Sequence, residues 1–217
     1  MSSFEINDKD LPGLFQSADR TSAYEQKRHF FTLALYLFLL VLAASIDFAD
    51  SLESNSTYKV VATLLFLFTL AITIWRKFNK PENVWYNGRA VAESVKTRSW
   101  RYMMCAHPYQ NDIDDAQVRK VFIEDLKTIL KQNESLIKAI GANTSMEEPI
   151  TTKMSQAREI PLRDRFLLYR DQRITNQAKW YNKKTKDNKR AANMFFWITI
   201  LLHLVAIILL LFSVGNP

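Results

Sequence analysis

The chain has 217 residues, of which 48% are hydrophobic and 24% charged, and its formal net charge is +7. These averages would suit one soluble domain, but the apolar residues are concentrated in three blocks and the rest of the chain is strongly charged. That clustering excludes an ordinary soluble domain and indicates a membrane protein with a polar part. The single cysteine, Cys105, excludes an internal disulfide and gives no sign of an oxidising compartment.

The scarcity of turn residues and of strand patterns predicts an all-α membrane protein, and the N-terminal segment bears on how its first span is used. Only four glycines occur, and strands that alternate apolar and polar residues are hard to find. The opening sequence MSSFEINDKDLPGLF is mixed and acidic, and lacks the order of a cleaved signal peptide. We therefore expect the first apolar block to be a retained membrane anchor.

The first two apolar blocks are predicted to form a transmembrane hairpin. Residues 30–46 (FFTLALYLFLLVLAASI) contain no charge, and about 17 residues is the lower limit for crossing a bilayer. Residues 60–75 (VVATLLFLFTLAITIW) are slightly shorter and gain length from Tyr58 and Lys59, whose long side chains can reach the headgroups. The acidic, serine-rich residues 47–59 are expected to connect the two spans.

Two further helices are predicted after the hairpin. The stretch PENVWYNGRAVAESVKTRSWRYMMCA contains good helix formers, with an interruption at Gly88, and the sequence HPY at 107–109 ends it. In residues 113–140 the apolar side chains recur at helical spacing, so a single amphipathic helix is expected there, with Gly141 as its C-cap. Its apolar face needs a partner surface to pack against.

The last part of the chain is predicted to be one long helix. Residues 162–214 contain neither glycine nor proline, and Pro161 suits the start of a helix. A fully helical stretch would be roughly 80 Å long at about 1.5 Å per residue. Its outer end, residues 194–214, is the longest apolar block and the third predicted span; a break near residues 185–188 stays open at this point.

These predictions divide the chain into five segments. They are a cytosolic N-terminal segment (1–29), a transmembrane hairpin (30–75), a cytosolic helical segment (76–148), a cytosolic long helix (149–193) and a third span (194–214).

The distribution of lysine and arginine predicts the orientation. Basic residues precede the first and third spans and follow the second, whereas the hairpin connection has one lysine against three acidic residues. Because basic residues are retained on the cytosolic side, we expect the N-terminus and the middle segment in the cytosol. The C-terminus is then on the other side of the membrane, which for a bacterial inner membrane is the periplasm.

Residues 76–193 hold 24 basic and 14 acidic side chains, an excess of ten positive charges. The basic residues crowd the membrane ends, which favours anionic lipids over nucleic acid as their partner. The candidate lipid-headgroup contacts are Arg76, Lys77, Lys80, Lys183, Lys184, Lys186, Lys189 and Arg190.

Small and hydroxyl side chains form a narrow face on each predicted span. Such residues allow close helix packing, and the ionisable His203 adds a functional candidate because charges are costly in the bilayer. Either His203 holds neighbouring helices together by a hydrogen bond (interhelical glue) or it lines a conducting path. Both alternatives require a homo-oligomer, because three spans cannot enclose a wide pore. The candidate pore or helix-interface residues are Thr199, His203, Ala206, Ser213, Thr69, Thr73, Thr32 and Tyr36.

Signatures of catalysis are lacking in the sequence. There is no Gly-rich phosphate loop, no nucleophile elbow and no pair of His or Cys at metal-binding spacing. We therefore expect a protein that is not an enzyme, with no cofactor and no metal site.

Several stretches resemble the SLATT family, whose name stands for SMODS and SLOG-associating two-transmembrane effector domains. They are SADRTSAYEQKRHFF before the hairpin and NVWYNGRAVAESVKTRSWRYMM followed by HPY after it. The stretch PLRDRFLLYRDQRITNQAKWYNKKTKDNKRAANMFF is similar to the opening of a second domain of the same family. A second hairpin would need a fourth span, which this sequence does not contain. Two possibilities stay open: the native protein has three spans, or the sequence is a piece of a longer protein.

The resemblance implies a membrane effector of a bacterial anti-phage or conflict system. Such an effector is expected to oligomerise in the inner membrane, to form a pore or otherwise permeabilise it, and to cause growth arrest or cell death, as in abortive infection. The trigger would come from a separate sensor, which nucleotide signalling could control. The alternative is a membrane-anchored scaffold or accessory subunit that recruits cytosolic partners without forming a pore.

Overall fold

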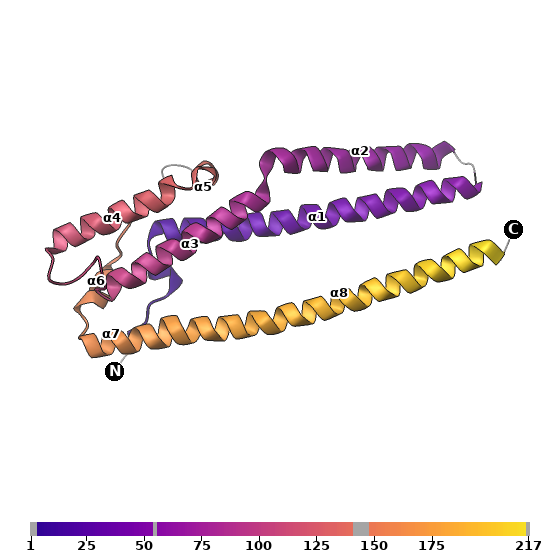
Figure 1. Ribbon diagram of the computed structural model, residues 1–217. Coiled ribbons are helices and arrows are strands. Elements are labelled where there is room, and N and C mark those ends of the chain that lie inside the picture. The colour runs from indigo at the N-terminus through magenta and orange to yellow at the C-terminus, as the bar shows by residue number, and fades with distance from the viewer. Residues whose placement is uncertain (1–3, 54–55, 141–147, 216–217) are drawn as a thin grey trace. The chain divides into compact units, whose positions relative to one another are not determined.

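The computed structural model describes residues 4–53, 56–140 and 148–215, and the side chains at 47–53, 134–135, 209–210 and 212–215 are outside that description. The regular elements of these ranges are all helical (Figure 1). They form two compact units, Ile6–Ile160 on the one hand and Met1–Glu5 with Pro161–Pro217 on the other.

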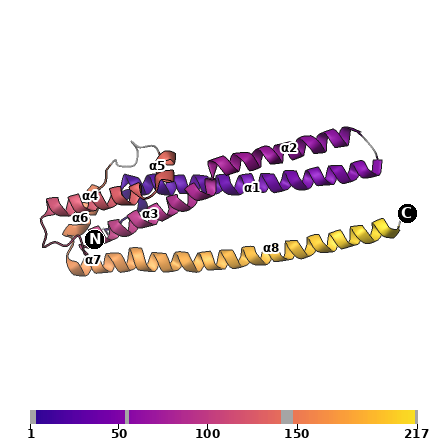
Figure 2. The same cartoon turned by 45° about the horizontal axis from the view of Figure 1, so that its top comes forward.

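The larger unit is built along one long helix, α1 (Gly13–Glu53). Its 41 residues correspond to about 60 Å, twice the roughly 30 Å of a hydrocarbon core. Helix α2 (Ser56–Asn79) returns antiparallel to its second half, and α3 (Pro81–Met103) packs beside its first half (Figures 1 and 2). Only the second half of α1 is apolar, so the first half extends out of the membrane.

The connection between the first two spans is much shorter than residues 47–59. Helix α1 continues to Glu53 and α2 begins at Ser56, so most of the short connection expected at residues 47–59 is helical. No proline or glycine occurs between Gly13 and Pro81 to end either helix. The acidic, serine-rich residues therefore extend the helices instead of forming a loop.

A sharp bend at Lys80 separates the apolar hairpin from the rest of this unit. Lys80 has a φ of 42°, in the left-handed region, and the proline that follows it disfavours a continued right-handed helix at this residue. The helix ends are satisfied on both sides of the bend: the N–H of Lys80 donates to the Arg76 carbonyl at 2.9 Å, and the N–H of Asn83 donates to the Lys80 carbonyl at 3.0 Å.

Beyond the bend, α3 and the start of α1 form a helical head with three shorter helices. These are α4 (Asp115–Lys131), α5 (Glu134–Ile140) and α6 (Thr152–Glu159). Three fully buried rings mark its core, with the Phe122 centroid 4.7 Å from that of Tyr102 and 5.6 Å from that of Tyr109. Other fully buried side chains of the head are Leu11, Leu14, Met103, Leu126, Leu136, Met154, Val91, Val95 and Val118.

The amphipathic segment 113–140 is two helices, so the prediction of a single helix is wrong. Its apolar face is buried as the periodicity predicts, and α3 is the partner surface. The helix is interrupted at Gln132 and Asn133, where the Asn133 side chain donates to the Ile129 carbonyl at 2.9 Å. Asparagine side chains compete with the backbone in this way and weaken helix continuity. The expected C-cap Gly141 lies outside the described residues.

The smaller unit consists of a continuous helical run: α7 (Leu162–Tyr169), a π-helical segment η2 (Arg170–Thr175) and α8 (Asn176–Gly215). The π turn is wide enough for the Thr175 hydroxyl to donate to the Arg170 carbonyl at 3.0 Å. The helix passes through residues 185–188 without the break that the sequence left open (Figure 2). The preceding helix α6 is separate and ends before Ile160 and Pro161.

Within the described residues, three helical stretches are long and apolar enough to cross a membrane, namely Gly13–Ile46, Ser56–Met103 and Leu162–Ile208. The first two contain the predicted spans 30–46 and 60–75, and the third contains residues 194–208 of the predicted span 194–214. The protein is therefore an all-α membrane protein, as predicted.

Candidate functional site

Small residues of the first two spans lie inside the hairpin. Ala43 of α1 and Ala62 and Thr69 of α2 are buried, although most large apolar side chains of both helices are exposed. Thr32 and Tyr36 are half-buried, and Thr73 is exposed. The hairpin therefore uses its small residues where α1 and α2 touch, which is how membrane helices approach closely.

The threonine hydroxyls of this hairpin bond to their own helices. Thr32 donates to the Arg28 carbonyl at 2.9 Å, Thr69 to the Phe66 carbonyl at 2.8 Å and Thr73 to the Thr69 carbonyl at 2.9 Å. Each hydroxyl is satisfied locally, so burial does not leave a polar group unpaired in the membrane. Within the single chain these residues contribute small size to the packing.

The polar face of the third span lies on α8. Thr199 Oγ1 donates to the Phe195 carbonyl at 2.8 Å, and His203 Nδ1 lies 2.7 Å from the Thr199 carbonyl oxygen. Because a carbonyl oxygen only accepts, Nδ1 is the donor of this hydrogen bond, and Nε2 has no hydrogen-bond partner in the described residues. Ala206 shares this face and is exposed, as are Thr199 and His203. Ser213 is in the same helix, but its side chain is outside the described residues.

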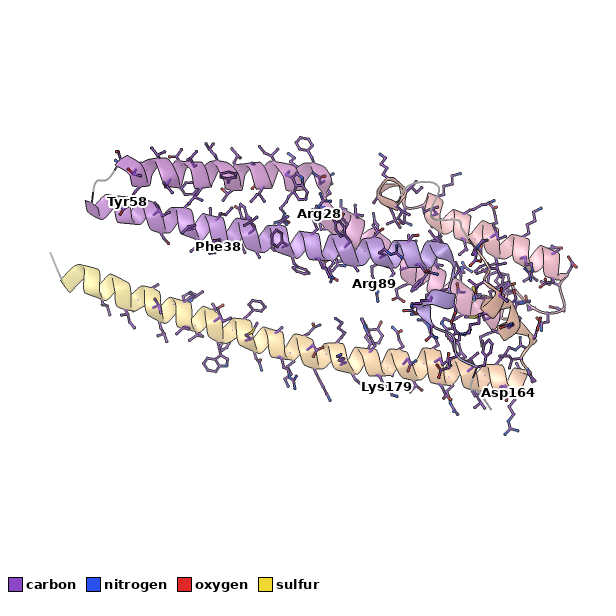
Figure 3. All side chains as sticks on the ribbon, turned by 180° about the vertical axis from the view of Figure 1, so that it is seen from behind. Arg28, Phe38, Tyr58, Arg89, Asp164 and Lys179 are labelled. Carbon is purple, nitrogen blue, oxygen red and sulfur yellow. The ribbon has the colours of Figure 1, made fainter. Side chains whose placement is uncertain are left out.

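Charged and aromatic residues gather where the hairpin meets the head. The Arg28 guanidinium lies 4.4 Å from the centroid of the Trp75 ring and bonds to Glu25 at 3.1 Å. Figure 3 shows Arg28 on α1 near the end of α2. On the other side, His29 Nδ1 lies 3.5 Å from a carboxylate oxygen of Glu82, the second residue of α3. Protonation of His29 would make this pair ionic.

Glu82 and Trp85, which were not predicted from the sequence, also lie at this boundary. The Trp85 ring lies 5.9 Å from that of His29 and 5.5 Å from that of Phe30. Tryptophans at both Trp75 and Trp85, beside basic residues, are typical of a membrane-water interface. That signal could have identified the boundary, but only the fold shows which side chains meet there.

The candidate headgroup residues occupy two helices. Arg76 and Lys77 end α2, and Lys80 forms the bend. The second group, which precedes the apolar part of α8, is exposed, and the Lys184 ammonium lies 5.9 Å from the centroid of the Trp180 ring. The members of this second group are Lys183, Lys184, Lys186, Lys189 and Arg190.

Among the residues that the structure describes, no group of three or more His, Cys, Asp or Glu side chains could hold a metal ion. The chemistry visible in the spans is therefore that of hydroxyl, imidazole and small apolar groups.

The hairpin and its head form a helical unit with two apolar spans, and a third apolar helix follows in the smaller unit. The family model described as "SMODS and SLOG-associating 2TM effector domain 3" matches residues 12–166, and "SMODS and SLOG-associating 2TM effector domain 1" matches residues 169–216. The chain belongs to the SLATT family, the two-transmembrane effector domains associated with conflict systems. No curated protein and no solved structure matches the chain.

The first match covers the hairpin and the helices α3 to α6 of the head, and the second covers the whole of η2 and α8. The resemblance seen in the sequence is thus confirmed for both parts. The similarity of residues 169–216 to another domain of the same family explains why a third apolar span follows a complete hairpin and head.

Proposed function

We propose that this protein is a bacterial inner-membrane effector that assembles into homo-oligomers and permeabilises the membrane when a separate sensor is triggered. The observation that carries the proposal is the exposed polar face of α8. No residue in the most apolar 18-residue window of the third stretch is buried, so lipid or other helices must cover it. His203, hydrogen-bonded back to its own helix, leaves Nε2 without a protein donor in the described residues.

Lipid cannot satisfy such a group, because polar atoms in the hydrocarbon lack hydrogen-bond partners. A ring of identical copies could bury the face of Thr199, His203 and Ala206 around an axis, where water or a neighbouring helix could satisfy the imidazole. The family description as effector domains supports this assignment. We assign no enzymatic activity, cofactor or nucleic-acid binding to the chain.

The charge distribution supports a cytosolic head. Arg76, Lys77 and Lys80 lie at the end of α2 that is next to the head. The basic group of α8 precedes the apolar part of that helix in the chain. Basic residues are retained in the cytosol, which leaves the turn between α1 and α2 in the periplasm.

The decisive experiment measures membrane potential and dye influx in bacteria that express the protein inducibly, with and without the genes encoded beside it. Collapse of the potential together with dye entry supports the effector. An intact potential while the protein is triggered and present in the membrane would instead support the alternative, a membrane-anchored scaffold that recruits partners through the head. Native mass spectrometry in mild detergent, at several concentrations, tests assembly, and a strictly monomeric species would contradict it.

A further inference from the structure

A basic cavity of about 980 Å³ opens in the larger unit, where α1, the bend between α2 and α3, and α5 come together. We call it the bend groove. Its volume is at the upper end of the range for small-molecule sites, so it would hold a nucleotide or a lipid headgroup rather than a single inorganic ion. Its charged and amide-bearing lining includes Arg20, Glu25, Arg28, Lys80, Asn83 and Lys138.

The charge of the bend groove is strongly positive. It has four cationic side chains and one carboxylate, Glu25, which is buried against Arg28 at 3.1 Å. In the part of the chain that the structure describes, Arg20, Lys80 and Lys138 have no carboxylate within ion-pair distance. These three cations come from three different elements, α1, the bend and α5, although they are 118 residues apart at their extremes in a chain of 217.

Like charges that line one groove repel one another, so an anion that neutralises them is favoured there. The Asn83 amide adds a hydrogen-bond donor to the same wall, and Arg offers a planar fork that matches phosphate oxygens. Phosphate esters, with several oxygens and at least one full charge, fit this set of donors better than a carboxylate does.

The rim of the bend groove lies at the membrane surface. The groove is also lined by Phe78, which is 81% exposed at the end of α2, and by Tyr24, which is 62% exposed. Exposed aromatic rings next to Arg76 and Lys77 are typical of the interfacial zone of a bilayer. A headgroup could therefore enter from the membrane side and a soluble ligand from the water side.

We propose that the bend groove is a binding site for a phosphate-bearing anion, held by Arg20, Arg28, Lys80 and Lys138. The anion is either the headgroup of an acidic phospholipid or a soluble phosphate ester such as a nucleotide. It connects the short helix α5 to α1 and to the bend from which the hairpin leaves the head. The proposal does not depend on pore formation, because its test measures binding alone.

The test compares the full chain with the double variant Arg20→Gln/Lys138→Gln. Both positions are exposed on helices, and glutamine is a good helix former, so the fold is retained. The matched control, Lys120→Gln/Lys131→Gln, removes the same two charges from exposed positions of α4 that lie outside the bend groove. Circular-dichroism melting checks that all three proteins fold alike.

One arm uses nanodiscs of phosphatidylcholine only and titrates adenosine triphosphate, as a soluble phosphate ester, by calorimetry. The other arm purifies the protein from mixed phosphatidylcholine and phosphatidylglycerol and measures the ratio of retained acidic to neutral lipid by native mass spectrometry. Two interfacial charges are expected to change binding by roughly 10- to 30-fold at low salt.

Saturable nucleotide binding that the groove variant loses and the control keeps assigns the site to a soluble ester. Loss of acidic-lipid retention in the groove variant alone assigns it to a headgroup. Equal behaviour of the groove variant and the control in both arms would overturn the proposal, because the effect would then be one of general surface charge. Absence of any preference for either anion in the wild-type protein would overturn it too.

Discussion

Gly88 of α3 lies against Ser22 of α1 so closely that a Cβ at position 88 would be 3.1 Å from the Ser22 Cβ and 3.2 Å from the Ala18 carbonyl oxygen. Ser22 is itself buried and its hydroxyl donates to the Trp85 carbonyl at 3.1 Å. The glycine that interrupts a good helix-forming sequence is thus a point of close contact between α1 and α3.

Gly88→Val is expected to destabilise the head by about 1–3 kcal/mol, because the branched side chain would overlap backbone atoms of α1 that cannot move aside. The matched control is Ala90→Val, at an exposed position of the same helix. Thermal unfolding of the purified protein in detergent, followed by circular dichroism, measures the difference. Equal melting temperatures for the two variants would contradict the close contact.

Arg158→Met is expected to destabilise the head by about 2–3 kcal/mol, because charged hydrogen bonds to buried carbonyls are lost. The Arg158 guanidinium donates to the carbonyls of Tyr102 at 2.6 Å and Tyr109 at 3.0 Å, and to the Asn111 side chain at 3.2 Å. Arg158→Lys should recover only part of the loss, since one ammonium cannot span this fork of acceptors. Gln156→Met, on the exposed side of α6, serves as the control in the same melting experiment.

The head is expected to lose stability in alkaline solution through Tyr109. Burial, and then its hydrogen bond to the Asp125 carboxylate, raise the pKa of Tyr109 above its usual value, while Arg98 opposes the shift. Because the unfolded chain releases this proton near pH 10 and the folded chain does not, the contribution is complete below pH 10 and is lost as the pH rises towards the folded pKa.

Tyr109→Phe should therefore cost about 1 kcal/mol near neutral pH, from the lost hydrogen bond, and should make the decline above pH 10 shallower than in the wild type. Burial also raises the pKa of Tyr102, so some decline remains. Unfolding midpoints at pH 8 and pH 11 provide the measurement, and Tyr86→Phe, at an exposed ring, is the control. A Tyr109→Phe protein with the wild-type alkaline slope would argue against the buried Tyr109–Asp125 contact.

His203→Leu separates a conducting path from interhelical glue. If His203 lines a path, the variant keeps its expression and oligomer size but no longer permeabilises the membrane, because the lost group served water or ions. If it is glue, assembly weakens by about 1 kcal/mol per hydrogen bond, and permeabilisation falls with the amount of oligomer. We expect the first result. Dye influx and native mass spectrometry are measured on the same preparations.

Thr199→Val, one turn away, removes a hydroxyl at nearly constant volume. The Thr199 hydroxyl donates to the Phe195 carbonyl, so it is satisfied within α8, and its replacement should have a smaller effect than His203→Leu. Full permeabilisation and unchanged assembly in the His203→Leu protein would leave the residue without a role in either process.

A cysteine at position 54 is expected to react with a membrane-impermeant thiol reagent in intact cells, because the positive-inside tendency places the turn of the hairpin outside the cytosol. Position 54 is outside the described residues, and native Cys105 is half-buried in the head. We therefore place the cytosolic reporter at the exposed Lys120 of α4, in a Cys105→Ser background. Labelling of the Lys120→Cys protein before the membrane is permeabilised would reverse the proposed orientation.

The sequence alone predicted the features that depend on a single segment. Three charge-free apolar runs identified the three spans, since partition into a bilayer is a property of each run by itself. The absence of glycine and proline from residues 162–214 predicted the continuous helix through η2 and α8, and the apolar periodicity of α4 predicted its buried face. Helix ends were less accurate, because the polar residues 47–53 are helical next to an apolar run and Asn133 ends α4 by a local side-chain bond.

The tertiary structure decided which residues meet. The contact of Gly88 with Ser22, the His29–Glu82 pair and the bend groove each bring together segments that are far apart in the chain. The groove in particular depends on the left-handed turn at Lys80, which sets the direction in which α3 leaves the hairpin, and on the seating of α5 through Leu136. Hydropathy and helical periodicity describe one segment at a time, whereas distances between segments follow from how their side chains pack.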